Sequence, residues 1–207
     1  MGAYDFLAAQ LPYLIYGQNV PMSSADFKDL ARKKMVSSEA AMLDYCTLDP
    51  DPQTAEVVSA GQDSGETGNK AKDFYTYAKP PKRTASAFIN QWKDWERALR
   101  LNMGRSRIQK FKREGMVLPD APDQPVDAVA AAKNVQTIES PLEAEIFLDK
   151  VRWNAIESFQ GMNIFSENAI YAYLLKLQLM ERRLAFNTEE GFTEYKGLYA
   201  AILGEQK

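Results

Sequence analysis

The sequence predicts an all-α fold, mainly a helical bundle with long loops, and three observations support this prediction. Apolar residues recur at helical spacing through most of the 207-residue chain. Capping residues such as Ser and Thr precede these periodic segments, and Gly or Pro follows them. Hydrophobic residues make up 45% of the chain, which is enough to bury a core. We therefore expect residues 1–207 to form a single, mainly helical domain.

The N-terminal part of the chain predicts short helices. Residues 4–15 are interpreted as a helix or as an extended lead-in, because a Leu-Pro pair interrupts the helical spacing. Ser23 is a candidate N-cap for a helix over about 25–35. Ser37 is a candidate N-cap for a second helix, over about 38–47.

Two polar segments separate the predicted helices. The first is a mobile insert over about 50–80, which begins in an Asp-Pro-Asp-Pro run and is rich in Gly and Ser at 59–72. The second is a Pro-containing linker over about 114–125. Strand-like alternation is weak, and only residues 4–8 and 54–58 are compatible with one short N-terminal strand pair.

The second half of the chain predicts longer helices. Ser140-Pro141-Leu142-Glu143 is a strong start signal, because it combines an N-cap Ser, Pro at the first helical position and Glu at the third. Gly161 marks the end of the same helix. By this reasoning, helices are predicted over about 85–113, 125–134, 140–160, 166–186 and 188–203.

Three apolar stripes identify the candidate core. Each stripe gathers residues that fall on one face of a helix at about 100° per residue. We expect these faces to pack together as the core of the bundle. The stripes are Phe88, Trp92, Trp95 and Leu99; Leu142, Ile146, Trp153 and Ile156; and Ile170, Leu174, Leu177 and Leu184.

Composition excludes several kinds of catalytic site. The chain has no His, which removes the commonest general base and the commonest metal ligand. Its single cysteine, Cys46, cannot form an internal disulfide or a thiolate cluster. A Ser-His-Asp triad, a Cys-His dyad and a His-containing zinc site are therefore excluded. We expect no catalytic, cofactor-binding or metal-binding residues.

Two carboxylates fall on the apolar stripes. Asp149 lies on the stripe of the 140–160 helix and Glu181 on that of the 166–186 helix. A buried carboxylate must be paired or protonated, because isolated burial is costly. We expect ion pairs with buried arginines, for which the candidates are Arg97, Arg100, Arg152 and Arg182. The alternative is a general acid/base pair of a hydrolase, which requires both carboxylates to face one cavity.

Positive charge is concentrated in one segment. Residues 79–113 hold 11 Lys and Arg against 2 Asp and Glu, a net charge of +9, whereas the whole chain has a net charge of −3. We expect the basic helix over 93–113 to face an acidic partner protein. Nucleic-acid binding is the alternative, although the tryptophans and most arginines fall on different faces. The candidate surface comprises Arg97, Arg100, Arg105, Arg107, Lys110, Lys112 and Arg113.

The sequence carries no sign of export or of a membrane span. The apolar N-terminal stretch has no basic residue before it and contains Asp5. No run approaches the roughly 20 apolar residues that a membrane helix needs. We expect a cytoplasmic protein.

Several blocks of sequence resemble a known bacterial family. They are YDFLAAQLPYL, then SSADFKDLARKKM, then WKDWERALRLNMGRSRIQK, and finally SPLEAEIFLDKVRWNAIESFQGMNIFSENAIYAYLLKLQLMERR. In this order they look like a family of unassigned domain whose genes lie in V-type ATPase operons. The last block, with Asp149 and Arg152-Trp153, is the most specific part of the resemblance.

That family is distantly similar to the C subunit of archaeal-type ATPases, which is called d in eukaryotic V-ATPases. The resemblance implies an all-helical, non-catalytic accessory or C/d-like subunit of a V-type ATPase, a pump for protons or sodium ions. It also implies partners on the central shaft or membrane-ring side, and a place at the inner face of the cell membrane. It implies no small-molecule substrate and no cofactor.

Overall fold

The computed structural model describes residues 4–49, 83–111 and 125–184. Within these ranges every regular element is helical and no strand occurs, which confirms the all-α prediction. The elements are α1 (Asp5–Gln10), α2 (Ser24–Arg32), α3 (Ser37–Ala40), the 3₁₀ helix η1 (Ala41–Tyr45), α6 (Ala87–Lys110), α7 (Val126–Asn134), the 3₁₀ helix η2 (Val135–Thr137), α8 (Pro141–Gln160) and α9 (Glu167–Leu184).

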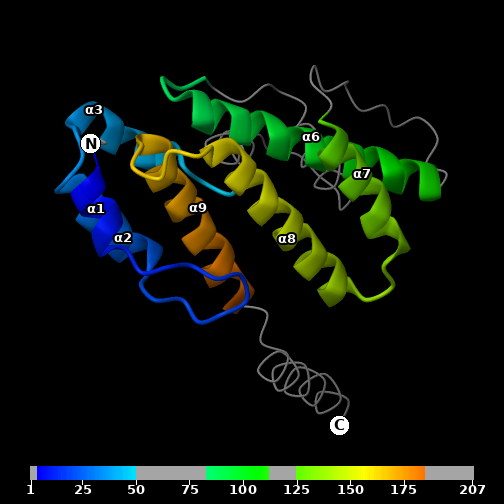
Figure 1. The fold of residues 1–207 in the computed structure, drawn as a ribbon. Helices are drawn as coiled ribbons and strands as arrows, with labels where there is room; N and C mark the ends of the chain where they lie inside the picture. The colour runs from blue at the N-terminus through cyan, green and yellow to red at the C-terminus, as the bar shows by residue number, and fades with distance from the viewer. Residues whose placement is uncertain (1–3, 50–82, 112–124, 185–207) are drawn as a thin grey trace, which may run out of the picture.

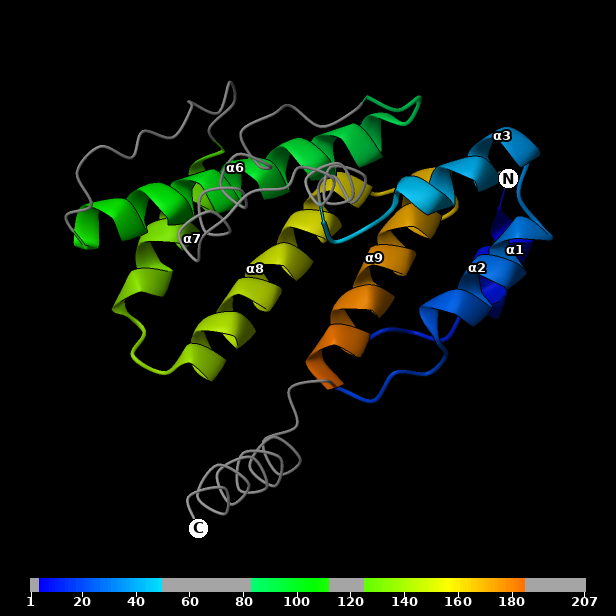
Figure 2. The ribbon, with the colours of Figure 1, turned by 180° about the vertical axis from the view of Figure 1, so that it is seen from behind.

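The helices are arranged around an antiparallel pair, α8 and α9. Figure 1 shows α8 and α9 side by side, with α6 running across their upper ends and α7 beside the C-terminal half of α6. On its other side α9 packs against α2, and α1 lies next to α2 in both views (Figures 1 and 2). Helix α9 is therefore enclosed between α8 and the N-terminal helices.

Capping residues set the ends of the main helices. The Ser140 hydroxyl accepts a hydrogen bond from the Glu143 N–H at 3.4 Å, and Pro141 opens α8. The same helix ends at Gly161, whose φ of +71° is readily adopted only by glycine. Ser86 caps α6 and Ser23 caps α2 in the same manner as Ser140. The ends at Ser23, Ser140 and Gly161 lie where the sequence signals predict them, and Ser86 lies within one residue of the predicted start of its helix.

Most residues of the predicted stripes are buried, and they form the centre of a core to which every other described helix also contributes. All four residues of the α6 stripe are buried, and Trp92 and Trp95 stack at 5.7 Å between ring centroids. In α9, Ile170, Leu174 and Leu177 are buried, but Leu184 is 60% exposed. In α8, Leu142 at the first turn is likewise exposed. Both of these residues lie at helix ends, and Ile146, in the second turn of α8, is half-buried.

Some N-terminal predictions differ from the structure. Residues 5–10 form helix α1, which confirms the helical interpretation of this segment and contradicts the strand considered for residues 4–8. The helix stops at Leu11, which is extended because a following Pro disfavours the helical conformation. The predicted helix over 38–47 is one α-helical turn continued as the 3₁₀ helix η1. The predicted strand at 54–58, the mobile insert over 50–80, the linker up to 124 and the helix over 188–203 lie outside the described residues.

None of the helices in the described ranges combines the length and apolar character needed to cross a membrane.

Candidate functional site

The interior of the bundle contains a carboxylate held by two arginines. Glu96, on α6, is fully buried. Its Oε2 accepts a hydrogen bond from Arg152 Nε at 3.0 Å, and its Oε1 accepts from Arg152 Nη2 at 3.0 Å and from Arg100 Nε at 2.7 Å. Burial acts to raise the pKa of Glu96, but Arg152 and Arg100 outweigh burial and hold this pKa below its ordinary value.

The ion pair between Glu96 and Arg152 belongs to a larger network that joins three helices. Arg152 Nη1 donates to Asp149 Oδ1 at 3.2 Å, and Arg182 of α9 lies 3.8 Å from the same oxygen. Arg182 also donates to Glu145 at 2.6 Å. Burial raises the pKa of Asp149, and the two arginines only partly offset this effect. The network links α6, α8 and α9, and Arg100 extends it to Asp49 at 2.8 Å.

Of the two carboxylates and four arginines considered for buried ion pairs, the structure brings Asp149, Arg152, Arg182 and Arg100 together in this network. Asp149 and Arg152 are buried, and Arg182 is half-buried beside them. Glu181 lies elsewhere, because its Oε1 accepts a hydrogen bond from the Ser24 N–H at 2.6 Å, at the start of α2. Sequence reasoning overlooked Glu96, although its position at the edge of the α6 stripe was the signal that it would be buried.

The geometry does not form the acid/base pair considered as an alternative. Asp149 is bound to arginines and Glu181 to a backbone N–H. Neither residue lines the apolar groove described below, nor the smaller hollow between α7 and α8. A hydrolytic dyad needs both carboxylates at one accessible cavity, so these contacts favour a structural role for each.

The basic residues of α6 divide into two groups. Arg97 is only 6% exposed, and Arg100 is engaged in the ion-pair network, so the expectation that they lie on an open partner surface is wrong. Further along, Arg105 is half-buried, and Arg107 and Lys110 are exposed near the end of the helix. Lys110 Nζ donates to the Gln136 carbonyl at 3.1 Å. Lys112 and Arg113 lie outside the described residues.

The tryptophans of α6 face the interior, away from these cations. Trp92 Nε1 donates to the Thr47 carbonyl at 2.9 Å, and Trp95 Nε1 donates to Asp127 at 2.8 Å. Both rings are buried, so they cannot stack on bases.

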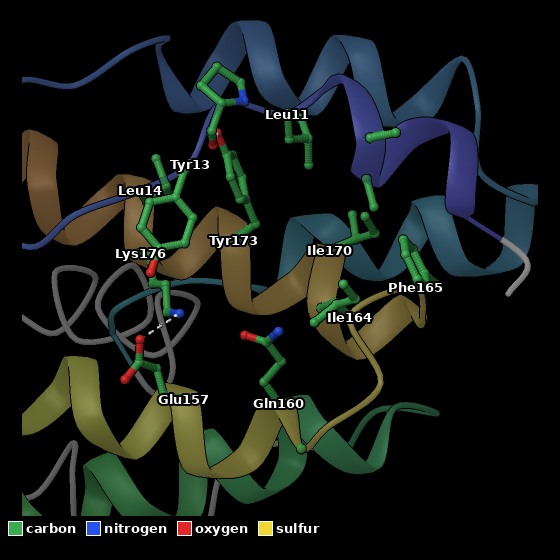
Figure 3. Close-up of a pocket in the computed structure, with 15 residues that line it drawn as sticks. Leu11, Tyr13, Leu14, Glu157, Gln160, Ile164, Phe165, Ile170, Tyr173 and Lys176 are labelled. Atoms are coloured by element: carbon green, nitrogen blue, oxygen red, sulfur yellow. Dashed lines mark hydrogen bonds and ion pairs between the residues drawn. The ribbon is translucent and has the colours of Figure 1, made fainter.

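An open apolar groove lies on another side of the molecule, shown in Figure 3. It has a volume of about 650 Å³ and lies between the chain from α1 to Leu14, the end of α8 and the first half of α9. Ala8, Leu11, Leu14, Ile164, Phe165 and Ile170 provide most of its apolar lining. The Tyr173 hydroxyl donates to the Pro12 carbonyl at 2.9 Å, which ties one wall of the groove to α9.

A few polar groups border the groove. Glu157 Oε1 accepts from Lys176 Nζ at 3.1 Å and from Trp153 Nε1 at 2.9 Å. The amide of Gln160 projects from α8 into the groove (Figure 3). No signal in the sequence identified this groove, because its walls come from segments about 150 residues apart in the chain.

The described residues offer no metal centre: no group of three or more Cys, Asp or Glu side chains among them is arranged to hold an ion. Cys46 is buried, and burial raises the pKa of its thiol. Its thiol is therefore protonated and shielded from solvent, which is typical of a packing role.

No family model, curated protein or solved structure matches this chain.

Proposed function

We propose that the chain is a non-catalytic accessory subunit that acts through protein contacts. The observation that carries this proposal is the ion-pair network, in which Glu96 and Asp149 are bound to arginines. Buried carboxylates held in this way are unsuited to proton transfer at a substrate. The ion pairs of Glu96 and Asp149 join helices from distant parts of the chain, as a stiff scaffold requires.

The proposed complex is a V-type ATPase, in which this chain would be a C/d-like or accessory subunit at the cytoplasmic face of the membrane. The resemblance to the bacterial family whose genes lie in V-type ATPase operons supports this choice. Its blocks fall on α1, α2, α6, α8 and α9, which supply most of the core residues, and α7 with the short helices supplies others. The resemblance thus involves the residues that define the packed scaffold.

The proposed contact surface is the C-terminal end of α6. Arg107 and Lys110 are exposed there, with Arg105 half-buried next to them. A cluster of cations attracts an acidic partner and accelerates its association, and salt weakens this effect. An acidic face on the shaft or on the membrane-ring side is the expected partner.

The test is an affinity pull-down of the tagged protein from its native cells at moderate salt, with mass spectrometry of the bound fraction. We expect the catalytic A and B subunits together with the D and F shaft subunits. A triple charge reversal, Arg105→Glu, Arg107→Glu and Lys110→Glu, should abolish this recovery. The matched control, Lys33→Glu, Lys34→Glu and Lys150→Glu, makes the same charge change at exposed positions away from the end of α6 and should preserve it.

Absence of all four ATPase subunits from the wild-type pull-down would contradict the proposed complex. Recovery that is equal for the two triple variants would exclude the α6 surface and leave the complex in place. Extending the reversal to Arg113, as the sequence alone proposes, tests the remaining part of the basic segment.

A nucleic-acid-binding role is the second candidate, favoured by one observation. Phe111 is exposed at the end of α6, next to Lys110 and one turn after Arg107, so an aromatic ring and two cations share this end of the helix. Fluorescence anisotropy with a labelled single-stranded oligonucleotide at low and high salt tests this role. Tight binding that weakens steeply with salt would support it.

A further inference from the structure

Two helices contribute cations to the basic surface at the end of α6. Helix α6 ends at Lys110, and Arg107 is exposed one turn earlier. The last turn of α7 carries a further basic residue, Lys133, which is also exposed. Lys110 Nζ donates a hydrogen bond at 3.1 Å to the carbonyl of Gln136, which follows Lys133 closely in the chain. The C-terminal ends of α6 and α7 therefore lie next to each other, and Figure 1 shows the same arrangement.

The side chain of Lys133 lies on a different side of α7 from the face toward α8. Alanines form the buried face of α7, and Asp127 and Asn134 line the hollow between α7 and α8. Lys133 belongs to neither set, because successive residues of a helix point about 100° apart. Its exposed ammonium group is therefore accessible to a partner that contacts the end of α6.

Cations outnumber carboxylates at these two helix ends. Residues 99–110 of α6 include no Asp or Glu, and three of their basic residues lie outside the ion-pair network that holds Arg100. In α7, Asp127 lies at the opposite end of the helix from Lys133. Glu139 lies in the loop that leads from η2 toward the start of α8, away from the end of α6 (Figure 1). A local excess of positive charge therefore remains.

Two hydrogen bonds hold α7 against α6. Trp95 Nε1 donates to Asp127 at 2.8 Å near the start of α7, and Lys110 donates to Gln136 just beyond its end. An ammonium group has three donors, so Lys110 keeps two for a partner. The relative position of the cations on the two helices is thus set before a partner binds, which lowers the entropic cost of association.

The charge of the rest of the chain favours an acidic protein over a nucleic acid. Domains that bind nucleic acids are usually strongly basic as a whole, whereas this chain has a net charge of −3. Charges farther apart than about 8–10 Å are largely screened at physiological salt. A short acidic segment bound at this end therefore interacts mainly with the local cations, whereas a long polyanion would also meet the acidic remainder of the chain.

We propose that the ends of α6 and α7 form one cationic surface that binds an acidic segment of a partner protein, with Lys133 as a contact residue. Carboxylates of that segment pair with Arg107, Lys110 and Lys133. This inference rests on the proposed function, because it concerns the same end of α6, and it adds α7 to the contact. The pairs are exposed to solvent, so salt weakens them.

Three labelled probes test the chemistry of the surface. The first is a short peptide of Glu, Gly and Ser; the second replaces every Glu by Gln; the third is a single-stranded oligonucleotide of the same net charge as the first. Fluorescence anisotropy at low and moderate salt measures their affinities for the full-length protein. We expect the Glu peptide to bind about tenfold or more tightly than the Gln peptide at low salt, and at least as tightly as the oligonucleotide.

Single charge reversals locate the binding. Lys133→Glu and Arg107→Glu should each weaken binding of the Glu peptide about threefold to tenfold, and the double variant should weaken it further. Lys150→Glu makes the same charge change as Lys133→Glu at an exposed position on α8 and should leave the affinity unaltered. All three positions are exposed, so the midpoint of thermal unfolding should remain that of the wild type.

Each contrary result has a separate meaning. Unchanged affinity in Lys133→Glu, with weaker binding in Arg107→Glu, would exclude α7 and leave the α6 surface of the proposed function in place. Unchanged affinity in both variants would exclude the whole surface. Equal affinity for the Glu and Gln peptides would remove the argument from charge. Tighter binding of the oligonucleotide than of the Glu peptide would assign the surface to a nucleic acid.

Discussion

Glu96 of α6 and Arg152 of α8 form a two-point ion pair inside the protein, with both N–O distances at 3.0 Å. The two residues are 56 positions apart in the sequence, and both are almost completely buried. Parallel hydrogen bonds from a guanidinium group fix the relative orientation of the partners as well as their distance. This contact therefore joins α6 to α8 in one defined orientation of the two side chains.

Removal of Arg152 should destabilise the fold strongly. Arg152→Met fills a similar space but leaves Glu96 with Arg100 alone and deprives Asp149 of its nearest cation. Losing one partner of a buried pair typically costs about 3–5 kcal/mol, and urea unfolding followed by circular dichroism measures it. Arg32→Met breaks an exposed pair with Asp44 and should cost about 0.5 kcal/mol or less. A similar cost for both variants would contradict the role assigned to Arg152.

The two buried carboxylates should respond differently to neutralisation. The pKa of Glu96 is lowered in the folded protein, so its charged form stabilises the fold at neutral pH. The pKa of Asp149 is raised, so its charged form is disfavoured by folding. Glu96→Gln should therefore reduce the unfolding free energy at pH 7 by about 3 kcal/mol, and Asp149→Asn should reduce it less. The reverse order in urea unfolding would refute this assignment.

The pH dependence of the same variants follows from the directions of these shifts. The contribution of Glu96 is fully present above its unfolded pKa, near 4.5, and is lost as the pH falls through the lower folded pKa. The difference in unfolding free energy between the wild type and Glu96→Gln should therefore become smaller at acidic pH. For Asp149, stability is lost as the pH rises above 3.8 through the folded pKa. The unfolding free energy of Asp149→Asn, relative to that of the wild type, should therefore increase with pH. Unfolding curves over a pH series test both trends.

Tyr173 should hold the N-terminal wall of the groove. Its hydroxyl donates to the Pro12 carbonyl at 2.9 Å, and burial raises its pKa to about 12, so the donor persists through mildly alkaline pH. Tyr173→Phe should cost about 1 kcal/mol and accelerate amide hydrogen exchange around Leu14. Tyr13→Phe changes an exposed ring and should leave exchange unaltered. Unchanged exchange in Tyr173→Phe would indicate that this bond does not anchor the wall.

Gly161 should be intolerant of substitution despite open space around it. A Cβ at this position meets no atom within 4 Å, but the residue has a φ of +71°. A side chain in this conformation costs about 1–2 kcal/mol. Gly161→Ala should therefore lower the midpoint of thermal unfolding, whereas Ser158→Ala, exposed in the preceding turn, should not. Equal midpoints for these two variants would show that the loop adjusts its backbone to accept a side chain.

The candidate surfaces differ in how far they could be predicted. The charge of the α6 segment is visible in the sequence, but whether Arg97 or Arg107 is accessible depends on which helices cover α6. The groove could not be predicted, since Leu11 and Ile170 belong to different periodic patterns and become neighbours only after packing. Glu181 shows the same limit: its place on an apolar stripe predicts burial, but its partner is a backbone N–H of α2.

The sequence by itself determined the all-α class, the helix caps at Ser23 and Ser140, the end of α8 at Gly161 and the buried aromatic stripe of α6. Capping and periodicity act within a few residues, so short stretches of sequence contain the information. The tertiary structure alone decided that Glu96 binds Arg152, and that the end of α8 meets the N-terminal segment as a groove. These relationships depend on how whole helices cross, which is set by the combined packing of side chains from several elements.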